Sequence, residues 1–526
     1  MDKLKIYDST LRDGAQGYRI SFSVEDKIQI AMKLDEFGVD YIEAGYPISN
    51  IKDVEFFKEL QKINFKTSKI VAFGSTKKPG IKASEDYGLK SLIDVNTNYI
   101  AIYGKAWDFH VTDIINTSIE ENLNMIKQSI EYLVQNGKKV IFDAEHFFDG
   151  YKNNKEYATR VIKVAEEAGA FSIVLCDTNG GTYIDDIYEI TREAKGIVGR
   201  EIELGIHCHN DSGLAVANSI KAIQAGCVQV QGTFTGIGER CGNANLSTII
   251  SILELKLGIN CLANNEKLRD LKQTVEYISD ILNIETDEKM PYVGDNAFLH
   301  KGGAHIDGIK KNPKSFEHIL PETVGNERKS VISEQSGSSG IIEELQKIDS
   351  NLKKNNQKVK DILVKLKELE YQGYQFESAG ASFELVVLKE LGKYSSHFEL
   401  EDVKINITTP FDEVGSVTAV VKINAQDKRS ITVDEGVGPV NALDKALRKA
   451  LEGVFTNLKQ VYLTDYKVRV LDNKEGTEKL TRVLISSTDG VKKWTTVGVS
   501  ANIIEASFKA LVDSIEFKLL LDERTL

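Results

Sequence analysis

The sequence has few cysteines, no long apolar run and no excess of basic residues. Its five cysteines are odd in number, none lies in the second half of the chain, and no Cys-x-x-Cys pair occurs. A disulfide framework is therefore not expected, and reduced thiols are. No stretch approaches the roughly 18 uninterrupted apolar residues of a membrane span, and the first residues do not form a secretory signal. We expect a cytoplasmic protein with no membrane partner.

The charge balance argues against nucleic acid as a partner. The chain has 66 Lys and Arg against 78 Asp and Glu, a net charge of -12, whereas phosphate binding depends on clustered basic residues. At 526 residues the chain is too long for one hydrophobic core. At roughly 150 residues per domain, this length predicts about three domains.

Eight short apolar segments alternate with amphipathic helical patterns over residues 1–262. We expect strands at residues 5–10, 41–45, 69–74, 98–104, 139–145, 171–178, 204–209 and 228–234. Helical patterns between them include residues 24–37, 119–135, 156–167 and 214–225. A glycine follows each of these four helices, as is common at helix C-termini. Eight such units predict an α/β fold, the (β/α)8 TIM barrel, in preference to an open doubly wound sheet.

Polar side chains gather where the expected strands end, which is where a TIM barrel holds its active site. They are Arg12, Asp13, Glu43, Glu145, His146, Asp177, Thr178, Asn179, His207, His209, Glu239, Arg240 and Asn243. Solvated loop charges would explain any one of these residues. Solvated loop charges explain poorly why the opposite ends of the strands carry far fewer polar side chains.

The sequence Gly-Ile-His-Cys-His-Asn-Asp at residues 205–211 indicates a divalent-metal site. Alternate residues of a strand point to the same side, so His207 and His209 share one face. A hydrogen-bonded histidine pair at a strand end is the alternative. Asp13 is the expected third ligand, because barrel closure brings the first strand beside the last two, and Asn243 offers an amide oxygen. These ligands suit Mn²⁺, Zn²⁺, Co²⁺ or, less well, Mg²⁺.

The glycine-rich residues 236–242 match a dinucleotide-binding motif only superficially. Their spacing is Gly-x-Gly-x-x-x-Gly, and they follow the last expected barrel strand rather than opening a βαβ unit. Nucleotide binding is therefore not expected.

Three motifs together resemble the acyl-CoA-condensing metalloenzymes, namely the 2-isopropylmalate, homocitrate and citramalate synthases. The motifs are Asp-Ser-Thr-Leu-Arg-Asp-Gly-Ala-Gln at residues 8–16, His-Cys-His-Asn-Asp at 207–211, and Gly-Glu-Arg-Cys-Gly-Asn-Ala-Asn at 238–245. Four further segments look most like the citramalate branch of this family: residues 20–27, 73–76, 143–152 and 300–305. The similarity runs nearly end to end and is weakest near residues 345–367.

The resemblance implies an acyltransferase that condenses acetyl-CoA with pyruvate, hydrolyses the thioester and serves isoleucine biosynthesis. The same-family alternatives are 2-isopropylmalate synthase, which would accept 2-oxoisovalerate, and homocitrate synthase. It also implies roles for individual residues. The metal would polarise the oxo-acid carbonyl, Arg12 would stabilise developing negative charge, and Thr178 would donate to the substrate carboxylate.

The resemblance offers Glu145, Glu239 and His305 as candidates for the base that removes a methyl proton from acetyl-CoA. The sequence does not choose between them, because the position of the base matters more than its pKa here. Glu43 and His110 are further candidates for substrate contact. His146 could contact substrate or only shape the pocket.

Cys241 marks a departure from related enzymes. Related acyl-CoA lyases carry a reactive cysteine in a glycine-rich loop after the eighth strand. Cys241 lies nearby, but its surroundings are Glu-Arg-Cys-Gly-Asn, so we interpret it as a packed thiol and do not favour lyase activity. An amino-acid sensor on an inactive barrel is the non-enzymatic alternative, which the intact polar motifs disfavour.

The regular alternation stops after the barrel. Residues 263–370 predict a mainly helical linker region, with helices near 268–282, 341–348 and 359–369. Similar enzymes send a histidine from this region over the active site of a partner subunit, and the resemblance assigns that role to His305 in a homodimer.

The last segment, residues 371–526, has an internal repeat. Alternating strands are expected at residues 404–408, 416–424, 430–434, 466–471, 479–487 and 492–497. A helix follows each group of three, and the period is 62 residues, from Gly436 to Gly498. Two βββα units predict an α+β domain for dimerisation and regulation. The resemblance implies isoleucine as its effector.

Overall fold

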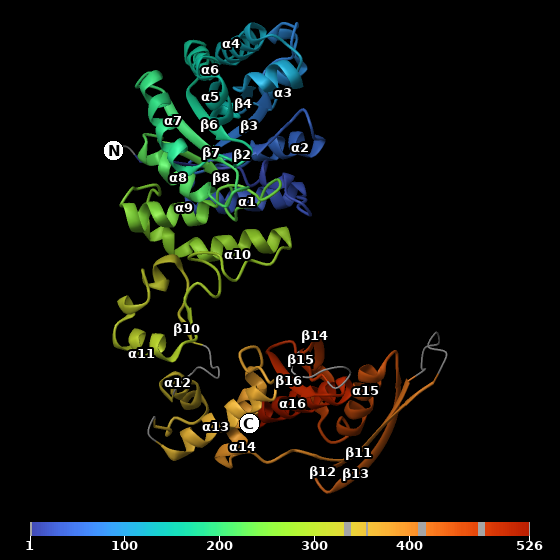
Figure 1. The fold of residues 1–526 in the computed structure, drawn as a ribbon. Helices are drawn as coiled ribbons and strands as arrows, with labels where there is room; N and C mark the ends of the chain where they lie inside the picture. Colours follow the sequence, from blue (N-terminus) through green and yellow to red (C-terminus); the bar gives the residue numbers. More distant parts are fainter. Residues whose placement is uncertain (1–2, 331–337, 354–355, 409–416, 472–478, 525–526) are drawn as a thin grey trace. The chain divides into compact units, whose positions relative to one another are not determined.

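The computed structural model describes residues 3–330, 338–353, 356–408, 417–471 and 479–524 (Figure 1). The chain divides into two compact units. The first comprises residues Met1–Phe298 and His318–Arg328, and the second comprises Leu299–Glu317 and Lys329–Leu526. Each unit is described separately below.

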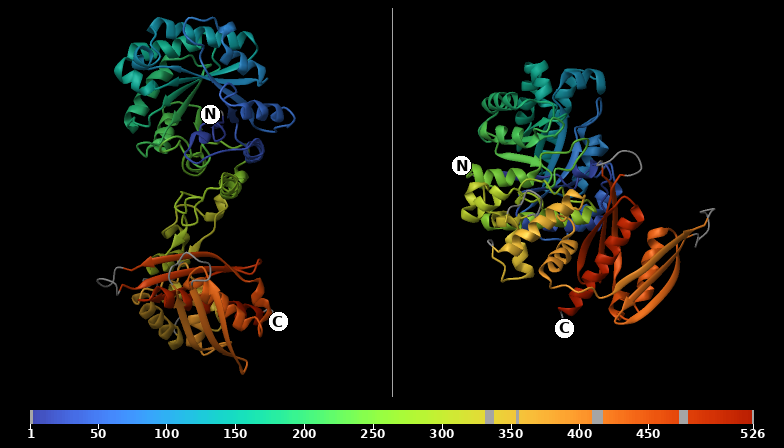
Figure 2. Two further views of the ribbon diagram at one scale, coloured as in Figure 1. Left: turned by 90° about the vertical axis from the view of Figure 1, so that its right-hand side faces the viewer. Right: turned by 60° about the horizontal axis from the view of Figure 1, so that its bottom comes forward.

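The first unit is a closed barrel of eight parallel strands in the order β1 to β8, with β1 paired to both β2 and β8. Helices surround these strands (Figure 2). The strands are β1 (Lys5–Asp8), β2 (Tyr41–Gly45), β3 (Lys69–Ser75), β4 (Tyr99–Lys105), β5 (Lys139–Glu145), β6 (Ser172–Asp177), β7 (Glu203–Cys208) and β8 (Gln229–Gly232). The predicted TIM barrel is confirmed, and every expected strand overlaps an observed one.

The helices of the first unit follow the predicted apolar periodicity. They are α1 (Val24–Phe37), α2 (Ile51–Leu60), α3 (Tyr87–Asp94), α4 (Ile119–Gln135), α5 (Phe147–Asn153), α6 (Lys155–Glu167), α7 (Ile184–Ile197), α8 (Ala215–Gln224), α9 (Leu246–Ile252) and α10 (Leu271–Leu282). Helix α1 shows how local sequence sets the boundaries. Ser23 and Asp26 form a capping box at its start, and Gly38 ends it in the left-handed region at φ 103°.

Two apolar layers hold the barrel together. The larger one packs the outward-facing strand residues, such as Ile6 and Ile42, against the inner faces of the helices. The smaller one fills the barrel interior with inward-facing residues that include Tyr7, Tyr41 and Phe73. Interior packing of this kind closes the barrel below the ends of its strands, so that chemistry is confined to the loops above.

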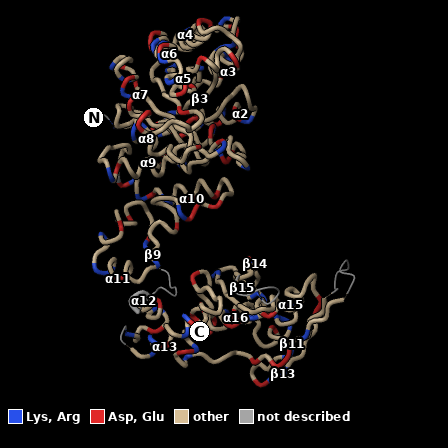
Figure 3. Tube along the Cα trace, in the orientation of Figure 1, with Lys and Arg blue, Asp and Glu red and all other residues tan. Residues whose placement is uncertain are grey.

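Charged residues of both signs alternate along the helices of the barrel. Lys and Arg are interspersed with Asp and Glu along helices such as α4, α6 and α7 (Figure 3). Several of these charges pair within one turn of a helix, as Lys33 does with Glu36. Among the described helices, none is both long and apolar enough to cross a membrane.

The expected linker region is largely helical. Helix α10 packs against α1 of the first unit. The second unit contains α11 (Gly303–Lys311), α12 (Ser338–Ile348), α13 (Gln357–Tyr371) and α14 (Gly380–Leu391), and a short parallel pair, β9 (Leu299–His300) and β10 (Lys329–Ser330). The domain boundaries expected at residues 262 and 370 stay a prediction.

The C-terminal repeat is present as two βββα units. The first consists of β11 (Glu399–Ile407), β12 (Val417–Ala425), β13 (Lys428–Gly436) and α15 (Pro439–Leu451). The second consists of β14 (Tyr462–Val470), β15 (Thr481–Thr488), β16 (Lys493–Ser500) and α16 (Ile503–Glu523). Both sheets are antiparallel, and alternate residues of β12 and β15 are buried on the face that their helix covers.

Candidate active site

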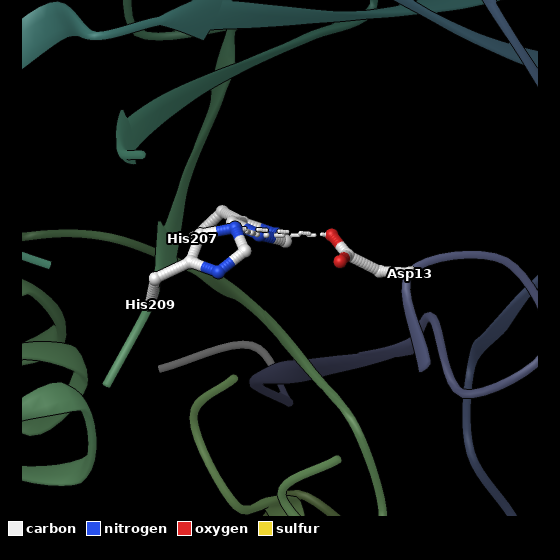
Figure 4. Close-up of side chains that lie close together, drawn as sticks. All are labelled: Asp13, His207 and His209. Atoms are coloured by element: carbon white, nitrogen blue, oxygen red, sulfur yellow. Dashed lines mark hydrogen bonds and ion pairs between the residues drawn. The ribbon is translucent and has the colours of Figure 1, made fainter. Parts of the chain in front are cut away.

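Asp13, His207 and His209 come together at the C-terminal ends of the barrel strands (Figure 4). His207 Nε2 lies 3.4 Å from Asp13 Oδ2, and His209 Nε2 lies 4.0 Å from the same oxygen. The two Nε2 atoms are 3.4 Å apart. The sequence-predicted trio is therefore assembled, because β1 and β7 flank β8 in the closed barrel.

The trio fits a divalent cation. All three side chains are buried, and Asp13 Oδ1 and His209 Nδ1 have no hydrogen-bond partner. Asn243 lies beside His209 through a backbone bridge, and its buried Oδ1 also lacks a partner. Buried polar atoms are normally hydrogen-bonded, so the unpartnered oxygens of Asp13 and Asn243 are available to a cation, whereas His209 would bind it through Nε2, the ring nitrogen that faces Asp13. Imidazole nitrogens with carboxylate and amide oxygens are a donor set for a first-row divalent metal.

The electrostatics of the trio differ between its members. Burial would lower the pKa of His207, but the hydrogen bond and charge of Asp13 outweigh it and raise that pKa. Burial would raise the pKa of Asp13, but Arg12 and the two histidines outweigh it and hold that pKa far below its usual range. Burial, with the neighbouring charge of His207, lowers the pKa of His209 to about 4. At neutral pH the site thus offers an ionised carboxylate and a neutral imidazole.

Gln231 orients His207 from inside the barrel. Its Oε1 lies 2.9 Å from His207 Nδ1. As an acceptor there, the amide oxygen places the ring proton on Nδ1 and leaves the lone pair of Nε2 facing Asp13. Gln231 Nε2 in turn lies 3.5 Å from Oδ1 of Asp143, a carboxyl whose pKa burial and the charge of Glu43 raise to about 7.

Arg12 is held beside the trio by three groups. Its Nε donates to Glu43 Oε2 at 2.6 Å, and its NH1 lies 3.2 Å from Asp13 Oδ2. Its guanidinium carbon lies 3.7 Å from the ring centroid of Phe73. Tyr7 donates to the other oxygen of Glu43 at 2.6 Å. Since both oxygens of this fully buried carboxylate are occupied, Glu43 contacts Arg12 rather than the open cavity.

A cavity of about 480 Å³ opens above the trio. The expected site residues in its lining are Arg12, Asp13, Glu145, Thr178, His207, His209 and Glu239. Glu43, His110, Asn243 and His305 were also expected at the site but do not line this cavity. The space exceeds what a three-carbon oxo acid needs, so it has room for a second reactant.

The three candidate bases differ in their surroundings. Glu145 ends β5 and forms an ion pair with Lys105. Glu239 is largely exposed on the loop after β8, where its carboxylate lies 3.4 Å from Arg240. His305 lies on α11 in the second unit, exposed, with its ring stacked on Phe316 at 4.1 Å between centroids.

The rings of His110 and His146 lie close together at a tilt of 47° beside the cavity. Their ring centroids are 4.4 Å apart, and Trp107 stacks on His110 at 5.3 Å. His110 begins a π-helical turn, a feature often found at functional sites. Burial and the charge of His146 lower the pKa of His110. Asp149 holds the His146 ring through Nδ1 at 2.9 Å.

The prediction that Cys241 is a packed thiol is wrong. The other four cysteines are buried free thiols, but Cys241 is exposed. It follows Arg240, which has a φ of 55°, and precedes Gly242. A Cβ atom on Gly242 would come within 2.0 Å of the carbonyl oxygen of Gly236, so the chain next to Cys241 is tightly turned.

The sequence interpretation did not single out Tyr7 and Gln231. Both are inward-facing polar residues on barrel strands, and both contact the residues that form the site. Polar side chains at alternate positions of a short, otherwise apolar strand were the available signal, as in the Gln-Val-Gln of β8.

Comparison with known proteins covers the whole chain. The HMGL-like family matches residues 3–275, the homocitrate synthase post-HMGL domain-like family matches 292–373, and the LeuA allosteric (dimerisation) domain matches 377–519. The chain is 49% identical to the (R)-citramalate synthase of Aquifex aeolicus over 523 residues, 99% of each chain. It is 46% identical to the (R)-citramalate synthase of Synechocystis sp. over 528 residues, covering 98% of this chain and 96% of the other.

More distant similarity extends to a 2-isopropylmalate synthase. The 2-isopropylmalate synthase of Methanocaldococcus jannaschii is 31% identical over 517 residues, 98% of this chain and 94% of the other. The three sequence motifs, the closed barrel and the order of the matched domains all agree with this similarity. The chain therefore belongs to the family of HMGL-like acyl-CoA-condensing enzymes that includes the citramalate, 2-isopropylmalate and homocitrate synthases.

Proposed function

We propose that this protein is an (R)-citramalate synthase. Acetyl-CoA, pyruvate and water would give (R)-citramalate and CoA, by formation of one carbon–carbon bond and hydrolysis of the thioester. The observation that carries this proposal is the contrast in identity. Identity is 49% to a citramalate synthase and 31% to a 2-isopropylmalate synthase, over nearly the same length.

The cavity supports a small oxo acid as acceptor. Tyr46, Phe73 and Tyr103 line it beside Arg12. Phe73 stacks on Tyr103 at 5.6 Å and meets Tyr46 edge-on at 5.7 Å. We propose that the side chain of the acceptor faces these three rings, where overfilling by a branched side chain would cost roughly 1–3 kcal/mol. The methyl group of pyruvate suits such a wall better than an isopropyl group.

The proposed metal ligands are Asp13, His207, His209 and Asn243, holding Mn²⁺, Zn²⁺, Co²⁺ or Mg²⁺. A divalent cation at this position supplies Lewis-acid polarisation of the oxo-acid carbonyl. Arg12 lies beside Asp13 with a fixed positive charge, where it would stabilise negative charge on the carbonyl oxygen during condensation.

Thr178 would donate its hydroxyl to the carboxylate of pyruvate. The base that removes a methyl proton from acetyl-CoA remains one of Glu145, Glu239 and His305, the last supplied by a partner subunit of a homodimer. Glu145 is the one whose carboxylate lies on a barrel strand and lines the cavity.

The duplicated C-terminal domain would regulate the enzyme. We propose that it binds isoleucine, the end product of the pathway, and that the enzyme acts as a cytoplasmic homodimer. The match to the LeuA allosteric (dimerisation) domain over residues 377–519 supports this. Isoleucine can lower activity only by binding one conformational state better than another. Truncation near Glu370 should therefore abolish inhibition by isoleucine. Inhibition that persists in the truncated protein would contradict the proposal.

A thiol-release assay tests the catalytic proposal. Purified protein loaded with Mn²⁺ would be given acetyl-CoA and a panel of 2-oxo acids, and both CoA release and the acid product would be measured. Pyruvate should give the highest rate and (R)-citramalate as product. Release of CoA without a new dicarboxylic acid would indicate hydrolysis of the thioester alone.

A further inference from the structure

Thr178 is held in place from two sides by residues with unusual backbone conformations. It follows β6 directly and lines the cavity. The backbone N–H of His146 donates to its hydroxyl oxygen, Oγ1, at 2.8 Å. The guanidinium of Arg240 donates from NH2 to its backbone carbonyl at 2.9 Å.

The hydrogen bond from His146 fixes the direction in which Thr178 can donate. A hydroxyl oxygen that accepts from an N–H keeps its own hydrogen free for a different partner. Because the N–H arrives from the loop after β5, the hydroxyl hydrogen is directed away from that loop. His146 donates this hydrogen bond from a left-handed conformation, at φ 56°, at the N-cap position of helix α5.

Arg240 fixes the backbone of Thr178 against the neighbouring loops. Its Nε and NH2 donate to the two carboxylate oxygens of Asp211 at 2.8 and 2.9 Å, a bidentate pair. One side chain thus joins the loops after β6, β7 and β8. The loops approach closely here, since a side chain on Gly180 would lie 2.7 Å from the backbone nitrogen of Asp211.

Both holding residues adopt a backbone conformation that L-residues rarely take. Among the described residues, nine other than glycine have positive φ, and Arg240, at φ 55°, is one of them. Four of the nine are Asn or Asp, whose short polar side chains tolerate this region. An Arg side chain forms no such local hydrogen bond that would favour it. Such conformations persist where surrounding contacts enforce them, and they cluster at functional sites. Here the enforcing contacts of both residues converge on Thr178.

We propose that His146 and Arg240 are positioning residues that aim the hydroxyl of Thr178 at the carboxylate of the 2-oxo acid. This inference rests on the proposed function, because that function supplies the carboxylate. In this proposal His146 acts through its backbone N–H. Arg240 acts through the N–H groups of its guanidinium, which bind Thr178 and Asp211 together. Neither residue needs to exchange a proton with substrate.

A double-mutant cycle tests the part played by Arg240. Thr178→Val removes the hydroxyl at constant shape, and Arg240→Lys keeps the charge without the fork. Each single variant should raise the KM for pyruvate about ten- to a hundredfold, the usual effect of losing a hydrogen bond to a charged group. Thr178→Ser keeps the hydroxyl and should avoid most of this increase in KM. Arg192→Lys, on the exposed face of α7, is the matched control for Arg240→Lys.

The combined variant decides the question. If Arg240 acts through Thr178, adding Arg240→Lys to Thr178→Val changes the KM for pyruvate no further. Multiplication of the two effects would overturn the proposal, because Arg240 would then act independently. Metal content and circular dichroism of each variant exclude a damaged fold or metal site. An unmodified protein that forms no product from pyruvate would refute the proposed function instead.

A pair of substitutions tests the part played by His146. Asn and Val both remove the imidazole and its contact to Asp149, but Asn tolerates the left-handed conformation and Val does not. His146→Val should therefore raise the KM for pyruvate at least about tenfold more than His146→Asn does. Equal effects of the two substitutions on KM, or equal losses in kcat with KM unchanged, would overturn the assignment.

Discussion

Arg12 donates a hydrogen bond of 2.6 Å from its Nε to Oε2 of Glu43, and both side chains are removed from solvent. A buried charge that loses its partner costs far more than the pair contributes when intact. The position of Arg12 beside Asp13 therefore depends on a carboxylate that does not itself line the cavity.

Replacement of Glu43 by Ala should destabilise the first unit by about 3 kcal/mol and lower kcat at least about tenfold, because Arg12 is left buried without its main partner. Tyr7→Phe removes one hydrogen bond to Glu43 and should cost about 1–3 kcal/mol. Urea unfolding and initial rates measure both effects. Glu59→Gln, at an exposed ion pair with Lys62, is the control. Parent-like stability and kcat in Glu43→Ala would show that Arg12 is held by other groups.

Replacement of His207 by Ala should abolish both bound metal and turnover, since it removes one of the two imidazoles and leaves only a carboxylate, one imidazole and an amide oxygen. Metal content by elemental analysis and the thiol-release rate are the two readouts. His318→Ala serves as a control, because this histidine packs against Tyr292 away from the barrel strands. Full metal occupancy together with activity in the His207 variant would remove Asp13, His207 and His209 as the metal site.

Gln231→Leu should weaken metal affinity about ten- to a hundredfold while the three ligands remain, because Leu cannot accept from His207 Nδ1. Titration calorimetry with Mn²⁺ measures this without any substrate. Gln231→Glu keeps an acceptor and should lose less affinity. If Leu and Glu behave alike, the amide of Gln231 does not set the orientation of His207.

The sequence predicted the barrel well because its information is local. Periodic apolar residues, a glycine after several of the helices and polar residues after most of the strands are all recognised within a few positions. Asp13 was placed with His207 and His209 because the topology of a closed barrel makes their strands near neighbours. The resemblance then added residue roles that periodicity alone could not supply.

What the sequence did not predict depends on contacts between distant segments. Glu43 was expected to touch substrate, and its burial beneath Arg12 follows from where Tyr7 of another strand points. Cys241 is exposed beside Arg240, whose left-handed backbone is a conformation that no local propensity favours. In the same way, the hydrogen bonds to Thr178 from His146 and Arg240 form only when the loops after β5, β6 and β8 lie together.

The pair of His397 and Glu516 should make the stability of the second unit depend on pH. The hydrogen bond and charge of Glu516 raise the pKa of His397, whose Nδ1 lies 2.6 Å from Glu516 Oε2. A raised pKa contributes stability below the unfolded value of about 6.5 and loses it as pH rises through the folded value. The parent should exceed His397→Asn by about 1–2 kcal/mol at pH 6 and by less at pH 9. Chemical unfolding at both pH values measures this, and an equal difference at both would contradict the assignment.

A comparison of pyruvate with 2-oxoisovalerate as acceptor tests most directly whether this protein is a citramalate synthase. The Mn²⁺-loaded protein would receive acetyl-CoA with pyruvate or with 2-oxoisovalerate, and kcat/KM would be measured for each by CoA release with identification of the product. We predict (R)-citramalate from pyruvate, with a kcat/KM at least about tenfold above that for 2-oxoisovalerate, the discrimination expected from steric exclusion of a branched side chain. Equal values, or a preference for 2-oxoisovalerate, would contradict the assignment as a citramalate synthase and favour 2-isopropylmalate synthase.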